Sequence, residues 1–140
     1  NMTYLLDSNI LIYLAFNGAA EHLAAKAITD QIIKANEIII LTEAVVLSFY
    51  RISTLLKPTP LTPAEARLFI DALLNYSKIQ FFNPTEQHYR NFGMRLEHEN
   101  IAGNLVMDAH LAEVSLLTNS TIVTNDDDFK KFPGVKFIKI

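Results

Sequence analysis

The chain has 140 residues, of which half are hydrophobic and 19% are charged, a composition that argues against disorder and suits one domain over residues 1–140. It contains no cysteine, which excludes a disulfide framework and a thiolate metal site and fits a reducing cytoplasm. With a formal net charge of −3, the chain would bind nucleic acid only through a local patch or a metal ion.

The apolar N-terminal stretch, residues 3–15, does not have the pattern of a secretory signal. It has no basic region before it, Asp7 interrupts it, and no small-residue cleavage site follows. Nowhere does the chain reach the roughly 20 uninterrupted apolar residues that a membrane helix needs. We therefore expect a soluble cytoplasmic protein with no membrane partner.

Strands and helices alternate along the predicted fold. Short apolar runs typical of buried strands occur four times, and a last run indicates an edge strand. In chain order, we expect strands at residues 3–6, 37–41, 78–82, 120–124 and 135–140. We expect helices at residues 10–16, 21–35, 43–56, 63–75, 86–99 and 105–117. This order predicts an α/β fold with a mostly parallel central sheet that helices cover on both faces.

Local signals set several helix boundaries. Ser8 or Asn9 can cap the first helix. The stretch Thr62-Pro63-Ala64-Glu65 combines a capping box with proline at the first helical position, so a helix should begin there. Pro58 and Pro60 should end the helix before it.

Carboxylates follow two of the expected strands. Asp7 comes directly after the first strand, and Asp126 to Asp128 come after the strand at 120–124. Asp108 lies near the start of a helix in an otherwise apolar stretch. Since ligands of open α/β sheets collect at the carboxyl ends of strands, these three segments are expected to meet at one edge.

Such a group of carboxylates would repel unless a cation joined them. A donor set of oxygens, without cysteine and without paired histidines, suits Mg²⁺ or Mn²⁺ rather than Zn²⁺. A site of this kind orients a phosphodiester and activates a water for in-line attack. The chemistry therefore favours hydrolysis of a phosphoryl or phosphodiester group.

Each carboxylate alone has a simpler explanation. Asp7 can cap the following helix, Asp108 can complement a helix dipole, and residues 125–129 can form a solvated turn. Their joint placement at strand ends favours the metal site over these explanations.

Two stretches resemble a known family. "LLDSNILIYL" resembles the opening of PIN-domain proteins, in which the first strand ends in Asp followed by Ser or Thr and Asn. "GNLVMDAHLAEVSL" and "TIVTNDDDFKKFPGV" are similar to the C-terminal half of VapC-type toxins. The resemblance implies a PIN-like α/β/α sandwich and a Mg²⁺- or Mn²⁺-dependent endoribonuclease, the toxin of a type II toxin–antitoxin pair. It also implies an RNA substrate, an antitoxin partner and a homodimer.

The resemblance assigns roles by position. Asp7, Asp108 and Asp126 match the acidic, metal-binding site of the family, and Asp128 matches its frequent additional acid. Asp127 falls at a variable position and is left out, while Asn9 matches a polar residue that supports the first Asp.

One position departs from the family. Where the helix after the second strand usually carries an acid three residues before Arg, this chain has Ser48 ahead of Arg51. A hydroxyl supplies no charge, so the change weakens the acidic site. Glu43 lies earlier in the same helix, off the face of Ser48, and is a speculative substitute.

The remaining candidates concern RNA contact and competing functions. Arg51, Lys57, Lys130 and Lys131 could contact RNA phosphates, or could simply be solvated. His110, beside Asp108 in sequence but about 200° away on a helix, is expected to pack rather than to act chemically. Ser48 motivates an alternative, a catalytically weakened PIN-like domain that binds RNA or a protein. A phosphatase ranks lower, because Asn9 stands where a second Asp would be needed.

Overall fold

The computed structural model describes residues 2–140 and contains the expected alternation of strands and helices. The strands are β1 (Thr3–Leu6), β2 (Ile38–Leu41), β3 (Ile79–Phe81), β4 (Thr121–Thr124) and β5 (Phe137–Lys139). The helices are α1 (Ser8–Ala15), α2 (His22–Lys34), α3 (Glu43–Ser53), α4 (Pro63–Leu74), α5 (Glu86–His98) and α6 (Leu105–Thr118), and a 3₁₀ turn, η1 (Asp128–Lys131), precedes β5. All the elements expected from the sequence are present, with ends that differ by a few residues.

The five strands form one parallel sheet in the order β3-β2-β1-β4-β5. Leu5 of β1 lies level with Ile40 of β2 and with Ile122 of β4. The central strands are short runs of large aliphatic residues, which suits strands covered on both faces. The predicted α/β class is therefore confirmed, and the sheet is parallel throughout.

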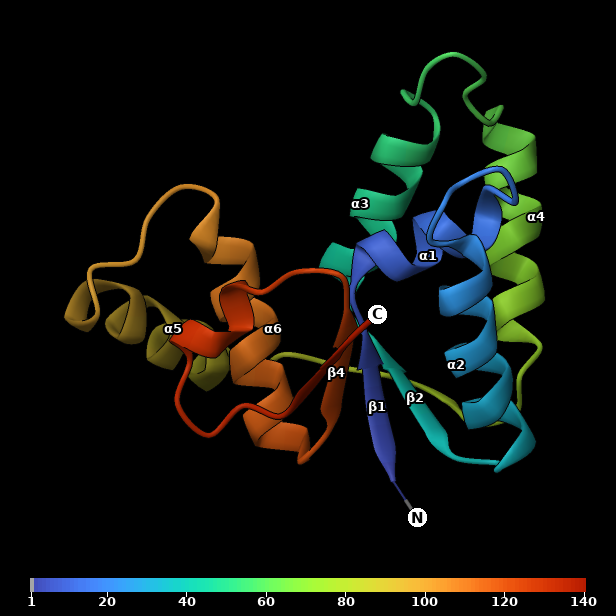
Figure 1. The fold of residues 1–140 in the computed structure, drawn as a ribbon. Helices are drawn as coiled ribbons and strands as arrows, with labels where there is room; N and C mark the ends of the chain where they lie inside the picture. Colours follow the sequence, from blue (N-terminus) through green and yellow to red (C-terminus); the bar gives the residue numbers. More distant parts are fainter. Residues whose placement is uncertain (1) are drawn as a thin grey trace.

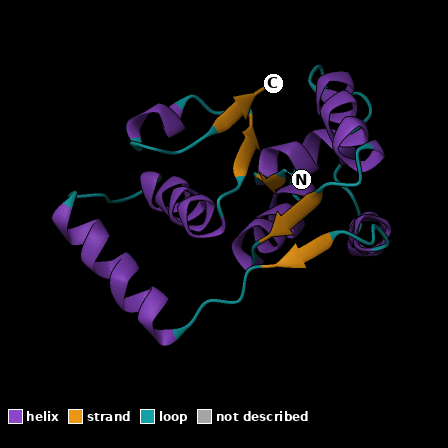
Figure 2. Cartoon of the chain, turned by 90° about the horizontal axis from the view of Figure 1, so that it is seen from below, coloured by secondary structure: helices purple, strands orange, loops and turns teal. Residues whose placement is uncertain are grey.

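The strand order explains which face each helix covers. The chain steps from β1 to β2 to β3 in one direction and then returns past β1 to β4. Because parallel crossovers are right-handed, the reversal moves the later helices to the opposite face. Figure 1 shows α1 to α4 on one side of the sheet and α5 and α6 on the other, and Figure 2 gives the view from below. Figure 1 shows α5 farther from the sheet than α6, and His88 is the one buried residue of α5 among those described.

The core lies between the sheet and its inner helices. Leu5, Ile39 and Ile122 of the sheet are fully buried, as are Phe49 of α3 and Phe129 of η1. This burial fixes the strand ends in space, because the apolar strands cannot slide without exposing these side chains. Among residues 2–140, no helix is long and apolar enough to span a membrane.

The first helix cap differs from the prediction. Asp7, rather than Ser8 or Asn9, caps α1, as the simpler explanation of this carboxylate had it, and its Oδ1 accepts a hydrogen bond from the Ser8 N–H at 2.7 Å. The chain turns into the helix directly at the end of β1, so α1 begins two residues earlier than expected. The capping box of α4 is confirmed, with Thr62 and Glu65 each accepting from the other's backbone N–H at 3.1 and 2.9 Å.

Candidate active site

The ends of β1 and β4 bring Asp7 next to Thr124. Leu6 lies level with Val123, and the Asp7 N–H donates to the Val123 carbonyl at 3.0 Å. The next residue of each strand therefore stands at the same edge of the sheet. Asp7 is only 9% exposed, although it carries a carboxylate.

The Thr124 hydroxyl joins Asp7 to the acidic loop that follows β4. Thr124 is fully buried, and its Oγ1 donates to Asp7 Oδ2 at 2.8 Å while it accepts from the Asp126 N–H at 3.0 Å. One hydroxyl thus orients two of the predicted site residues. Sequence analysis did not single out Thr124, although it is the strand's last residue and stands directly before the acidic loop.

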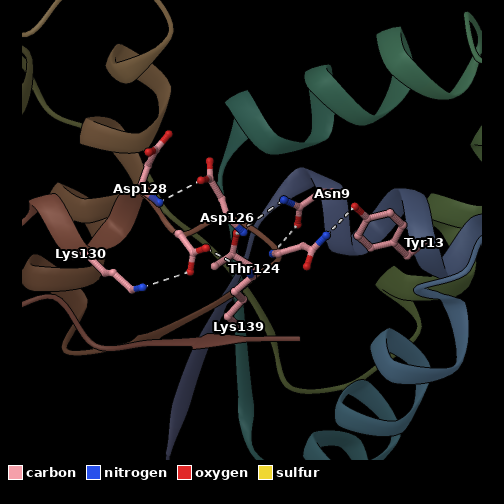
Figure 3. Close-up of polar contacts among 9 residues, drawn as sticks. Asn9, Tyr13, Thr124, Asp126, Asp128, Lys130 and Lys139 are labelled. Atoms are coloured by element: carbon pink, nitrogen blue, oxygen red, sulfur yellow. Dashed lines mark hydrogen bonds and ion pairs between the residues drawn. The ribbon is translucent and has the colours of Figure 1, made fainter.

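Asn9 lies on the other side of Thr124 (Figure 3). Its Nδ2 donates to Thr124 Oγ1 at 3.5 Å, and its Oδ1 accepts from the Asn125 N–H at 3.3 Å. Asn125 in turn donates from Nδ2 to the Tyr13 hydroxyl at 3.0 Å. Asn9 therefore reaches Asp7 through Thr124 rather than directly, and α1 braces the start of the acidic loop. Tyr13 and Asn125 carried no recognisable signal in the sequence.

Three carboxylates converge beside this network. Asp108, Asp126 and Asp128 each offer an oxygen within 4.8 Å of the others, and all three are half-buried. The Asp128 N–H donates to Asp126 Oδ1 at 2.9 Å, which holds the loop in this shape. The predicted ligand set was Asp7, Asp108 and Asp126. Asp7 lies outside the three-carboxylate group, and its two oxygens accept the hydrogen bonds described above.

The carboxylates influence one another electrostatically. Burial raises the pKa of Asp7, hydrogen bonds from Thr124 and Ser8 oppose the rise, and the Asp126 charge adds to it. Burial, followed by the charges of Asp126, Asp7 and Asp128, raises the pKa of Asp108 to about 7, which Lys131 partly opposes. Asp7 therefore lies within electrostatic range of the cluster.

The cluster fits a divalent cation. Its donor atoms are all carboxylate oxygens, which Mg²⁺ and Mn²⁺ prefer. Burial first, and then repulsion from the neighbouring carboxylates, disfavours the ionised form of Asp108 and raises its pKa. A bound cation would remove that repulsion.

Asp127 is not one of the three clustered carboxylates. It is exposed and pairs with Lys139 of β5 at 3.0 Å and with Lys130 at 3.5 Å. The hydrogen bond from Lys139 holds the pKa of Asp127 below its ordinary value. Lys131 pairs with Asp128 at 3.1 Å, so it is the predicted cation that touches the cluster directly.

The other two predicted cations lie farther out. Arg51 is exposed in the last turn of α3, and Lys57 is exposed in the loop after that helix. Figure 1 shows α3 and this loop projecting beyond the edge of the sheet. Neither cation forms an ion pair within the part of the chain that the structure describes.

Ser48 and Glu43 both stand outside the cluster. Ser48 is half-buried on α3, and Glu43 is exposed in the first turn of that helix. Leu5 and Ile40 are the last paired residues of β1 and β2, and Glu43 begins α3 two residues after the end of β2, at the same edge of the sheet as Asp7. Ser48 lies more than one helical turn farther along α3.

Known proteins share this fold and sequence pattern. The PIN domain model matches residues 4–135. The VapC ribonuclease Mb2897 of Mycobacterium bovis is 28% identical over 134 residues, which cover 94% of this chain and 91% of that protein. The structure of VapBC2 from Rickettsia felis, bound to a DNA fragment from their promoter, superimposes with a TM-score of 0.70 at 21% identity, covering 99% of this chain and 98% of that one. VapC20 of Mycobacterium tuberculosis, a sarcin–ricin loop cleaving toxin, gives 0.70 at 16% identity and covers 98% of both chains.

Proposed function

The chain belongs to the PIN domain family, and from this premise we propose that it is a Mg²⁺- or Mn²⁺-dependent endoribonuclease, the toxin of a type II toxin–antitoxin pair. The observation that carries the proposal is the convergence of Asp108, Asp126 and Asp128 beside Asp7 at the carboxyl edge of the sheet. The ribonuclease name of the Mycobacterium bovis relative supports it, as does the description of VapC20 as a sarcin–ricin loop cleaving toxin. An antitoxin partner, a homodimer and a cytoplasmic location complete the proposal.

In this proposal the three-carboxylate cluster holds the cation, and Asp7 completes the acidic edge. A bound Mg²⁺ or Mn²⁺ would orient the phosphodiester, ease deprotonation of the attacking water and stabilise the developing charge. Thr124 keeps Asp7 and the Asp126 backbone in place through its single hydroxyl. Without a cation, the Asp108 carboxyl holds a proton up to about neutral pH, since its pKa is about 7.

The assay that tests the proposal is cleavage of a mixed RNA pool with Mg²⁺, with Mn²⁺ and with EDTA. We expect the pool to be cut with a metal and to stay intact in EDTA.

Ser48 is the observation that favours the alternative, a weakened RNA- or protein-binding module, because it supplies no charge in place of the usual acid. Folded protein that cuts no RNA with either metal would support that alternative.

Glu43 enters the same assay as the candidate for the missing acid. We propose it because it stands just beyond the end of β2, at the carboxyl edge where Asp7 follows β1. If it supplies charge to the site, Glu43→Gln will need a higher Mg²⁺ concentration for half-maximal cleavage, whereas Ser48→Ala will not. Equal metal requirements for Glu43→Gln and the unsubstituted protein would exclude the role.

The raised pKa of Asp108 predicts how pH changes stabilisation by metal. Because its folded-state pKa, about 7, exceeds the ordinary 3.8, the metal-free protein loses stability as pH rises through this range. A cation must displace the Asp108 proton at low pH but meets an ionised cluster at high pH. We therefore expect Mg²⁺ to raise the melting temperature more at about pH 8 than at about pH 5.

Thermal unfolding with Mg²⁺ and with EDTA at the two pH values measures this difference. Asp108→Asn is the control, since its side chain does not titrate, and its pH dependence should be smaller. An equal Mg²⁺ effect at both pH values in the unsubstituted protein would contradict the assignment of Asp108 to the cation site.

A further inference from the structure

A cavity of about 370 Å³ lies between α3, the segment before α5, α5 itself and α6. Leu47 of α3 and Tyr89 of α5 line it, and they are 59% and 64% exposed. Phe82, Phe92 and His110 line it as well. Its volume falls within the range of small-molecule sites in proteins, and exposed apolar side chains rim it.

Aromatic rings form much of the cavity. His88 lies parallel to Phe92, with ring centroids 6.2 Å apart and an interplanar angle of 3°, and meets Phe82 edge-on at 5.0 Å. Tyr89 adds an exposed ring on the same helix. Flat aromatic surfaces that water can reach are what proteins use to stack unpaired nucleobases.

Polar atoms without partners accompany these rings. His88 is only 8% exposed, yet its Nδ1 has no hydrogen-bond partner within residues 2–140. The same holds for Nε2 of His110, whose ring lies 6.3 Å from that of His88. Both nitrogens are shielded from solvent, so they belong to the packing behind the cavity wall and are not open to a ligand in the cavity.

The cavity adjoins the carboxyl edge of the sheet. Thr42 and Glu43 line it, and they directly follow β2, as Asp7 directly follows the neighbouring strand β1. His110 lines it as well but lies about 200° around α6 from Asp108, so Thr42 and Glu43 make the connection. Glu43 at the cavity would repel a phosphate, so the base rather than the backbone is the part of a nucleic acid suited to enter it.

We propose that this cavity is a nucleobase subsite that takes one unpaired base of the RNA next to the phosphodiester held at the carboxylates. The inference rests on the proposed function, because it assumes RNA at the acidic cluster. Tyr89 stacks on the base and Leu47 covers it from α3, while the rings of His88, Phe92 and His110 form the wall of the cavity. A substrate whose bases are all paired cannot place one there.

Binding of short RNA tests the subsite. Fluorescence anisotropy would measure the binding of labelled adenine, cytosine and uracil hexaribonucleotides, each intact or with one abasic nucleotide. The protein carries Asp126→Asn and is kept in Mg²⁺, so that the RNA binds but is not cut. We expect Tyr89→Ala to weaken binding of the preferred hexamer about tenfold, and Tyr89→Phe to bind nearly as well as Tyr89. One abasic position should weaken binding to Tyr89 protein but not to Tyr89→Ala. Met94→Ala is the matched control, since Met94 lies on the same helix, is also 64% exposed and is outside the cavity.

The outcomes separate the subsite from the nuclease proposal. If the unsubstituted protein cleaved RNA but Tyr89→Ala bound the hexamer with unchanged affinity, the nuclease proposal would stand and the subsite would be overturned. Binding that depends on Tyr89 and on one base, without any cleavage, would keep the subsite and reject the nuclease. If Tyr89→Ala instead abolished a dimer in sedimentation with base-dependent binding unchanged, the cavity would be a protein contact and the subsite would be overturned.

Discussion

Asp126→Asn is expected to lower kcat/KM for RNA cleavage by roughly 10²–10⁴-fold, because it removes one charged oxygen ligand from the three-carboxylate cluster. Its amide has nearly the same shape, so the fold should persist. The Asp126 backbone N–H still donates to Thr124, since the substitution leaves the backbone unchanged. The measurement is the cleavage rate at several Mg²⁺ concentrations, with circular dichroism to verify folding.

Asp127→Asn provides a matched control one residue away. Asp127 carries the same side chain on the same loop, but it is exposed and pairs with Lys130 and Lys139 away from the cluster. The control should cleave RNA within about twofold of the unsubstituted protein, because a surface ion pair contributes little. Equal losses in both variants would mean that loop structure, rather than ligand charge, limits the reaction.

The meeting of Asp7 with the loop after β4 could be expected from the sequence. Both follow apolar strands of one parallel sheet, and carboxyl ends of parallel strands share an edge. The third segment, with Asp108, was placed by the same reasoning and by resemblance. This strand-end rule needs only the identity and direction of the strands, both of which the apolar runs indicate. It therefore predicted which segments meet without any side-chain detail.

The exact composition of the cluster could not be predicted in this way. Asp128, rather than Asp7, lies with Asp108 and Asp126, because the Asp128 N–H bonds to Asp126 and the loop closes on itself. Asp7 is occupied by hydrogen bonds at both oxygens. Such differences arise from loop conformation, which strand-end rules do not address.

The cavity beside α5 was also beyond the sequence pattern. Helix α5 was expected at residues 86–99, and Thr85 caps it by accepting from the His88 N–H at 3.2 Å. The helix is largely polar, and the sequence gave no sign of which of its residues face α6. His88 and Phe92 lie one helical turn apart on α5, but the contact of His88 with His110 of α6 depends on how the two helices are placed, which no local signal defines.

Thr124→Val should impair both stability and cleavage, because it removes the hydroxyl that serves Asp7 and Asp126 together. The change leaves Asp7 Oδ2 without its donor and the Asp126 N–H without its acceptor, in a position where Thr124 is fully buried. We expect the free energy of unfolding to fall by about 2 kcal/mol, a cost typical of unpaired buried polar groups. We also expect kcat/KM to fall roughly 10–100-fold, as for other residues that orient metal ligands.

Thr124→Ser separates the hydroxyl from the methyl group. Serine retains the Oγ that donates to Asp7 and accepts from Asp126, and it lacks only one buried methyl group. We therefore expect its free energy of unfolding to fall by about 1 kcal/mol and its cleavage rate to stay within severalfold of the unsubstituted protein. Urea unfolding and RNA cleavage on both variants give the two quantities. If Thr124→Val lost stability but cleaved normally, Asp7 and Asp126 would be held by the backbone alone. The hydroxyl would then serve the fold rather than the reaction.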